Sequence, residues 1–292
     1  EVQRRMMTTT GAANVHALAI EGTFDDCQAL VKEMFNDAGF RDRVRLSGVN
    51  SINWARIMAQ VVYYFTTAIA LGGPDRKISF TVPTGNFGDI FAGSIARAMG
   101  LPIRRLIVAT NQNDILHRAL TTGEYRVGTV EPSISPSMDI QVSSNFERAL
   151  FYAHAGEGAA VAQLMDELKS GGFTISQGAL QTLREQYLSG RVSEEETVAM
   201  IRTIRAETGE VLCPHSAVGV AVARQHVEPG VPMVTLATAH PAKFPDAVEQ
   251  AIGLRPPLPP HMAALFDLPE RVTRVENDVE ALKSLILERR TQ

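Results

Sequence analysis

Short strand-like runs alternate with amphipathic helical patterns along most of this chain, and this alternation restricts the fold more than any other feature. Alternation of this kind predicts α/β architecture with a mainly parallel sheet. The patterns predict strands at residues 14–20, 77–82, 106–109 and 231–238, and helices at 23–35, 51–71, 90–99 and 278–290. Residues 156–208 are typical of polar-faced helices, and the Pro-rich residues 255–260 are typical of a linker.

Three of these elements carry specific expectations. Thr23 is expected to cap the helix at 23–35. The helix at 51–71 is expected to bury one apolar face, and the strand at 77–82 to place alternate side chains on one side of its sheet. These two sets are Ile57, Met58, Val61, Val62, Phe65 and Ile69 in the helix, and Ile78, Phe80 and Val82 in the strand.

Composition excludes several classes of protein. A chain with 45% hydrophobic residues can bury a sizeable core, and a net charge of −4 supplies no general attraction to nucleic acid or an anionic membrane. The longest apolar tract, residues 52–71, contains Asn53 and Arg56, so it is not a membrane span. Two cysteines, Cys27 and Cys213, make no disulfide framework. We therefore expect a cytoplasmic protein with no nucleic acid or membrane partner.

The absence of several sequence motifs excludes further kinds of functional site. No two of the seven histidines lie within five positions of each other, so there is no local zinc signature. The chain has neither a Gly-x-Ser-x-Gly elbow nor a Gly-Lys-Ser/Thr phosphate loop, and residues 85–88 do not fit the Gly-x-Gly-x-x-Gly dinucleotide pattern.

The segment most suggestive of chemistry is Val82-Pro-Thr-Gly-Asn-Phe-Gly-Asp89, which lies between the strand at 77–82 and the helix at 90–99. Free amides at a helix N-terminus, with glycines that allow close approach to the backbone, form an anion site suited to a phosphate. Two glycines three positions apart are equally compatible with a plain tight turn capped by Asp89. Both interpretations stay open on this motif alone.

Two further segments are candidates for ligand contact. In Leu236-Ala-Thr-Ala-His-Pro-Ala-Lys243, Thr238 lies where a strand is expected to end, and ligands of open α/β sheets gather beyond the carboxyl ends of strands. The alternative is an ordinary strand end and turn. In Asn50-Ser-Ile-Asn-Trp-Ala-Arg56, Asn53 and Arg56 lie on one polar stripe at the start of a helix, which is either a solvated face or a second anion site.

Six long segments of the chain resemble threonine synthase of the microbial and fungal type. They occur in the family's order and extend from near the start of the chain to about Gly253. They are Gly22-Thr-Phe-Asp-Asp-Cys-Gln28, Asn50-Ser-Ile-Asn-Trp-Ala-Arg56, Pro83-Thr-Gly-Asn-Phe-Gly-Asp89, Ala109-Thr-Asn-Gln-Asn-Asp-Ile-Leu-His117, Ser135-Pro-Ser-Met-Asp-Ile-Gln-Val-Ser-Ser-Asn-Phe-Glu-Arg148 and Ala237-Thr-Ala-His-Pro-Ala-Lys-Phe244.

The resemblance implies a tryptophan-synthase-β-like fold (fold type II) with two α/β domains and pyridoxal 5′-phosphate between them. It also implies the conversion of O-phospho-L-homoserine and water to L-threonine and phosphate. By the same resemblance, Thr238 would hydrogen-bond the pyridine nitrogen of the cofactor. The loop around the cofactor phosphate would be formed by Gly85, Asn86, Phe87, Gly88 and Asp89.

Two other groups have lesser expected roles, the first by the resemblance and the second by its capping pattern. The residues expected to contact the substrate phosphate or its approach path are Asn50, Ser51, Asn53 and Arg56. A helix cap, arranged as a capping box, is expected from Ser143, Ser144 and Asn145 with Glu147.

One departure from the family concerns the Schiff-base lysine. In the family this lysine lies in a Phe-Lys-Asp motif upstream of the segment where this chain begins, and no Phe-Lys-Asp occurs here. The chain also begins Glu-Val-Gln-Arg-Arg, without an initiator Met or a signal-peptide pattern. We therefore expect no catalytic residue among these 292, and either a removed leader or a piece of a longer chain.

The expected organisation has three parts. Residues 1–46 would be the remaining part of an N-terminal α/β domain, 47–255 a large α/β domain with the phosphate loop, and 256–292 a linker and helical tail. Two functions of different class stay open, a threonine synthase that is inactive as the numbered chain alone and a catalytically silent phosphate-binding fragment. Another β- or γ-eliminating lyase of the same fold is the alternative enzyme. The sequence indicates no oligomeric state.

Overall fold

The chain forms two compact units in a computed structural model that describes residues 1–290. The first unit is Glu1–Gly48 together with Leu258–Gln292, whose last two residues lie outside the described part, and the second is Val49–Pro257. The sequence predicts a separate linker and helical tail at residues 256–292. The structure instead groups most of them with the start of the chain, because a strand near each end pairs with the other.

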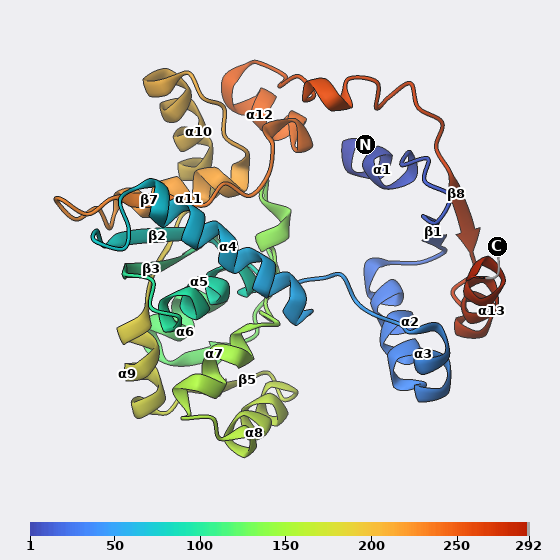
Figure 1. The fold of residues 1–292 in the computed structure, drawn as a ribbon, viewed down its shortest axis with the longest axis horizontal. Helices are drawn as coiled ribbons and strands as arrows, with labels where there is room; N and C mark the ends of the chain where they lie inside the picture. Colours follow the sequence, from blue (N-terminus) through green and yellow to red (C-terminus); the bar gives the residue numbers. More distant parts are fainter. Residues whose placement is uncertain (291–292) are drawn as a thin grey trace. The chain divides into compact units, whose positions relative to one another are not determined.

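The first unit is built on a parallel pair of strands, in register from Ala17 opposite Val272 to Ile20 opposite Val275. Thr23 caps the next helix in a capping box with Asp26, as the sequence predicts. The elements of this unit are α1 (Val2–Thr8), β1 (Ala17–Ile20), α2 (Phe24–Asn36), α3 (Ala38–Val44), η3 (Pro260–Met262), β8 (Val272–Val275) and α13 (Val279–Arg290) (Figure 1).

The second unit contains a parallel sheet of four strands in the order β6-β3-β2-β7, which confirms the predicted α/β architecture. These strands are β2 (Ile78–Pro83), β3 (Ile103–Thr110), β6 (Tyr187–Arg191) and β7 (Met233–Thr235), and a separate antiparallel pair is β4 (Glu124–Arg126) with β5 (Gly172–Thr174). The helices are α4 (Trp54–Ala70), α5 (Gly88–Ala98), α6 (Ile115–Thr122), α7 (Phe146–Ala153), α8 (Gly158–Leu168), α9 (Gln177–Gln186), α10 (Glu194–Thr208), α11 (Pro214–Arg224) and α12 (Pro245–Ile252), with the short turns η1 (Pro136–Met138) and η2 (Pro241–Lys243).

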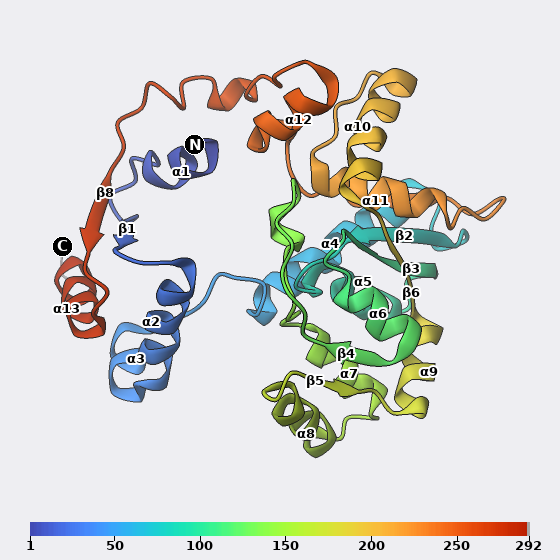
Figure 2. The same cartoon turned by 180° about the vertical axis from the view of Figure 1, so that it is seen from behind.

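Helices cover both faces of this sheet (Figure 1 and Figure 2). Leu106 and Val108 of β3 pack into the core beneath α5 and α6, whereas Ile107 and Ala109 pack on the other side, beneath α11. The same alternation places Ile78, Phe80 and Val82 in one core, as the sequence predicts. All six residues of β2 are buried, since this strand is central and covered on both faces.

The buried face of α4 agrees with the predicted one only in part. Met58, Val62 and Ile69 are 50%, 55% and 66% exposed, so they do not belong to the core of the described structure. Ile57 and Val61 are buried as predicted, and Phe65 is half-buried against the same core, whereas the buried residues Tyr64 and Ala68 were not predicted. Apolar residues occur on both sides of this helix, and packing against α5 buries the side that contains Tyr64.

Two strands lie in residues 156–208, which the sequence analysis described as helical. β6 contains Leu, Ser, Gly and Arg after Tyr187, a composition without the β-branched residues that mark strands. β6 nevertheless pairs with β3 from Leu106 opposite Tyr187 to Thr110 opposite Arg191. Tertiary pairing, and not local propensity, therefore makes this segment a strand.

Candidate active site

The loop after β2 supplies five backbone amides that have no acceptor in the described part of the chain. Residues 85–89 leave the carboxyl end of β2, and α5 begins at Gly88. Within residues 1–290, none of the amides of Gly85 to Asp89 donates a hydrogen bond, whereas Thr84 just before them donates to Ala109 at 2.8 Å. Because amides inside a protein normally have acceptors, this arrangement at a helix N-terminus indicates an anion site.

The carbonyl groups of the same loop are held from outside it. Ser143 Oγ donates to the Gly85 carbonyl at 2.7 Å, and Asn145 Nδ2 donates to the Asn86 carbonyl at 2.9 Å. Ser144 Oγ donates to Asn86 Oδ1 at 3.2 Å. The predicted capping box is therefore wrong. The residue before α7 is Asn145, and its side chain makes no capping hydrogen bond; its acceptor oxygen Oδ1 accepts from Arg148 Nε at 3.2 Å, and its Nδ2 donates to the loop.

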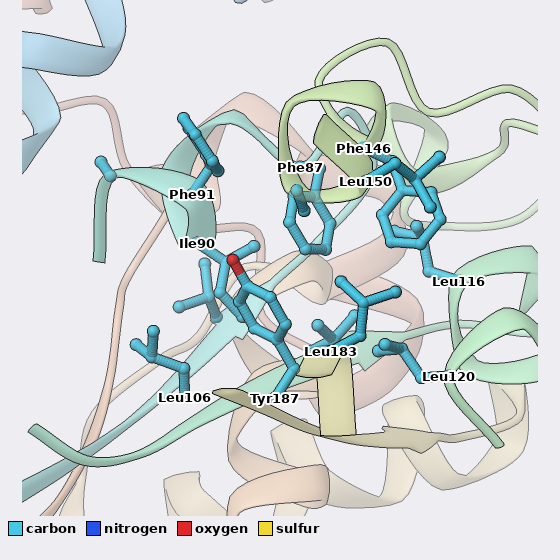
Figure 3. Close-up of a cluster of buried hydrophobic side chains, with 14 of the residues drawn as sticks. Phe87, Ile90, Phe91, Leu106, Leu116, Leu120, Phe146, Leu150, Leu183 and Tyr187 are labelled. Carbon is cyan, nitrogen blue, oxygen red and sulfur yellow. The ribbon is translucent and has the colours of Figure 1, made fainter. Parts of the chain in front are cut away.

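Phe87 is the last residue before α5, and its side chain stabilises the backbone conformation at this junction. Its φ of 64° lies in the left-handed region, which costs a non-glycine residue about 1–2 kcal/mol. Its buried ring lies edge-on to Phe146 and Tyr187, with centroid distances of 5.2 Å to each (Figure 3). Burial and aromatic packing of this ring offset the backbone strain.

Two neighbouring segments approach the loop closely. A Cβ at position 85 would lie 2.5 Å from the Ser137 carbonyl oxygen, so Gly85 cannot carry a side chain without movement of the backbone. A Cβ at Gly88 would lie 3.4 Å from the Cβ of Ser51. The structure thus brings Ser51, one of the four weaker candidates, beside residues 85–89, the loop predicted to bind phosphate and called the phosphate loop below.

The other three weaker candidates make local hydrogen bonds. The side chains of Asn50 and Asn53 accept from amides two residues further along the chain, at 3.2 and 2.9 Å, and Asn53 is the cap of α4. The exposed guanidinium of Arg56 donates to the carbonyl seven residues before it, at 3.0 Å. Their roles toward a substrate stay predictions.

Thr238 lies three residues beyond β7, which ends at Thr235 and is shorter than predicted. The amide of Thr238 donates to Ser216 Oγ at 3.1 Å, and its Oγ1 lies 3.7 Å from Cys213 Sγ. β7 runs parallel to β2 and beside it, so Thr238 and the phosphate loop leave the sheet at the same edge. The residue is exposed there, and its contact with a pyridine nitrogen stays a prediction.

Sequence reasoning missed His215, in the first turn of α11, because one histidine among seven gives no pattern. Its ring is 4% exposed, and its Nε2 accepts from the Ser137 amide at 3.1 Å. Burial, reinforced by the charge of Lys243 and opposed by Asp139, lowers the pKa of His215 to about 4. The ring is therefore neutral with its proton on Nδ1, which has no partner among the described residues.

A buried polar network fixes the segment that carries Ser137. Asn111 and Asn113 follow β3 and donate from their Nδ2 atoms to Asp139 Oδ1 at 2.8 and 3.0 Å. Ser133 donates to the same carboxylate from its Oγ at 2.6 Å and from its amide at 2.7 Å. Four donors on one carboxylate hold this segment at the carboxyl edge of the sheet, where Ser137 meets Gly85.

Asp89, the last residue of the loop, is largely buried. The Tyr64 hydroxyl donates to the Asp89 carbonyl at 2.8 Å and lies 3.4 Å from its Oδ1. Burial raises the pKa of Asp89 to about 6, and the contact with Tyr64 opposes this rise. A carboxyl that titrates in this range is less repulsive to a neighbouring anion than an ordinary aspartate.

Neither a metal cluster nor a large cavity marks a site at residues 85–89 in the described structure. No group of His, Cys, Asp or Glu within residues 1–290 could hold a metal ion. A cavity of about 620 Å³ is bordered by Trp54, Phe91 and Arg148, among others, but by none of residues 85–89. The free amides, and not the size of a cavity, therefore identify the candidate site. None of the helices in the described part of the chain has the length and apolar character needed to span a bilayer.

Comparison with known proteins gives two family matches. Residues 1–164 match the family described as pyridoxal-phosphate dependent enzyme, and residues 216–286 match threonine synthase, C-terminal. The threonine synthase of Pseudomonas aeruginosa is 54% identical over 289 residues, and that of Saccharomyces cerevisiae is 40% identical over 316. Both alignments cover 98% of this chain and 62% of the relative, so the chain spans about three fifths of the length of these relatives.

Solved structures agree with this match. Threonine synthase from Brucella melitensis with bound pyridoxal phosphate has a TM-score of 0.94 and 56% identity, covering 98% of this chain and 62% of that one. The yeast threonine synthase structure has a TM-score of 0.89 and 40% identity, covering 100% and 62%. The predicted fold type II and the resemblance to threonine synthase are thereby confirmed.

The Gly85 contact with Ser137 predicts a difference between the two loop glycines. Gly85→Ala is expected to weaken binding of inorganic phosphate about tenfold, because the new Cβ displaces the backbone and misdirects the amides. Gly88→Ala is the matched control and should change the affinity less than about threefold, since its Cβ meets ordinary contacts. Isothermal titration calorimetry measures both, and equal affinities of the two variants would contradict the assigned contact.

The raised pKa of Asp89 predicts a pH-dependent stability. The folded pKa of about 6 lies above the ordinary value of 3.8, so Asp89 destabilises the fold progressively as pH rises between these values. Asp89→Asn is therefore expected to raise the free energy of unfolding above pH 7 by up to about 2–3 kcal/mol, and to have little effect near pH 4. Urea denaturation between pH 4 and pH 7 measures the free energy of unfolding of both proteins. If the variant and the wild type were equally stable at every pH, the assigned effect of Asp89 would be refuted.

Proposed function

We propose, from the premise that this chain belongs to the family of pyridoxal-phosphate-dependent enzymes, that the protein is a threonine synthase. It would convert O-phospho-L-homoserine and water to L-threonine and phosphate. The observation that carries the proposal is the row of unpaired amides at residues 85–89, because it fits the phosphate of pyridoxal 5′-phosphate. The 54% identity to the Pseudomonas aeruginosa threonine synthase supports the choice of reaction.

The residues of this chain fit the cofactor at both ends. The five amides and the N-terminus of α5 would bind its phosphate, and the hydroxyl of Thr238 would donate to its pyridine nitrogen. Pyridoxal phosphate supplies an electron sink for bond changes at an amino acid substrate. A neutral hydroxyl, unlike a carboxylate, does not force protonation of the ring nitrogen, and so Thr238 sets the strength of that sink. The residues proposed to contact the substrate phosphate or its approach path are Asn50, Ser51, Asn53 and Arg56.

We also propose that none of the five lysines here is the Schiff-base lysine. Lys169 and Lys283 form ion pairs with carboxylates, and Lys32 is exposed on α2. Lys77 precedes β2 and so lies at the edge of the sheet opposite the phosphate loop. Lys243, in η2, follows Thr238 by five residues and is instead an anion-facing or structural lysine.

Two alternatives to this proposal are testable. A catalytically silent phosphate-binding fragment would have the intact mass of the numbered chain, 31.8 kDa, and would form no threonine. Another β- or γ-eliminating lyase of this fold would turn over a different amino acid and leave O-phospho-L-homoserine unchanged. A cytoplasmic location is part of the proposal and rests on the two cysteines, which are both free.

The proposed role of Thr238 predicts different effects of two substitutions in the complete enzyme. Thr238→Ser keeps the hydroxyl donor and should stay active, whereas the nearly isosteric Thr238→Val removes it. The Val variant is expected to lose about 1–3 kcal/mol of stabilisation in the chemical step, seen as a lower kcat for threonine formation from O-phospho-L-homoserine. Val is a good strand former, so equal turnover of the two variants would mean that Thr238 only packs.

The lysine assignment predicts the outcome of borohydride labelling. The numbered chain, treated with pyridoxal 5′-phosphate and borohydride, should show no stoichiometric pyridoxyl group on any one lysine, because none of the five is expected at the cofactor carbonyl. Peptide mapping by mass spectrometry measures the labelling at each position. Complete labelling at Lys243 would contradict the assignment and make that residue the catalytic lysine.

A further inference from the structure

We propose that Ser143 and Asn145 are positioning residues that set the direction of the amides in the phosphate loop, a role that rests on the proposed function of residues 85–89. Each side chain donates to a loop carbonyl, Ser143 to Gly85 at 2.7 Å and Asn145 to Asn86 at 2.9 Å. The Asn145 amide also donates to the Asn86 carbonyl, at 3.1 Å. Both carbonyls therefore point toward residues 143–145.

Because of peptide geometry, a side chain that holds a loop carbonyl also sets the direction of the next amide. A trans peptide unit is planar, so its C=O and the following N–H point in opposite directions. Holding the Gly85 carbonyl therefore directs the Asn86 amide away from Ser143, and holding the Asn86 carbonyl directs the Phe87 amide away from Asn145. A carbonyl that rotated inward would place negative charge where the anion binds and would withdraw an amide at the same time.

The two side chains are themselves fixed. Ser143 is 4% exposed and its amide donates to the Tyr125 hydroxyl at 2.7 Å. Asn145 is 1% exposed, and its Oδ1 accepts from Arg148 Nε at 3.2 Å. Ser144, between them, is half-buried and bonds only to the exposed side chain of Asn86 among the described residues, so it offers a matched control.

The experiment measures inorganic phosphate binding to the chain labelled with [¹⁵N]glycine, from the shifts of the Gly85 and Gly88 amides. Ser143→Ala is expected to weaken phosphate binding about tenfold, because the Gly85 carbonyl loses its donor. Ser144→Ala and Ser143→Thr, which leave that hydrogen bond intact, should bind within about twofold of wild type. Asn145→Ala keeps the backbone bond to Asn86, so an intermediate loss is expected.

The outcomes separate this proposal from the one on which it rests. If phosphate shifts neither glycine in the wild-type chain, the phosphate site itself is wrong. If the wild type binds and Ser143→Ala binds as tightly as Ser144→Ala, the positioning role is wrong. A purely structural role would lower the melting temperature of Ser143→Ala without changing the phosphate affinity of the folded protein, and that result also overturns the proposal.

Discussion

The parallel pairing of β2 with β3 on one side and β7 on the other is the constraint on which the candidate site depends. Parallel strands bring their carboxyl ends to one edge of a sheet, and here three connections begin at that edge. The phosphate loop follows β2, the segment with Asn111 follows β3, and the segment with Thr238 follows β7. A slip in register of β2 would move the loop away from the residues that orient it and would exchange the side chains on its two faces.

The sequence of residues 85–89 accounts for only part of the anion site that we propose there. Gly85 permits the close approach of Ser137, and Phe87 anchors a strained backbone, but neither one turns the carbonyls outward. That orientation comes from Ser143 and Asn145, which approach from a segment beyond β4. The result is a group of amides without internal acceptors, prepared for a ligand before it binds, so little reorganisation accompanies binding.

The sequence predicted the features that depend on neighbouring residues. The capping box at Thr23 and the position of the phosphate loop between strand and helix follow from patterns a few residues long. The role of Ser143 could not be found in this way, since its partner lies 58 residues away and a Ser-Ser-Asn-Phe-Glu segment is typical of a helix cap. The burial of Tyr64 and Ala68 in α4 and the strand β6 were missed for a related reason: packing against α5 and pairing with β3 decided them.

A crystal structure of this chain with pyridoxal 5′-phosphate would show whether the amides of residues 85–89 bind the phosphate of that compound, as we propose. Phosphate oxygens are expected at hydrogen-bond distance, about 2.7–3.2 Å, from these amides, with the Gly85 and Asn86 carbonyls still bonded to Ser143 and Asn145. A phosphate bound elsewhere on the second unit, or a loop whose carbonyls point toward the anion, would contradict this proposal.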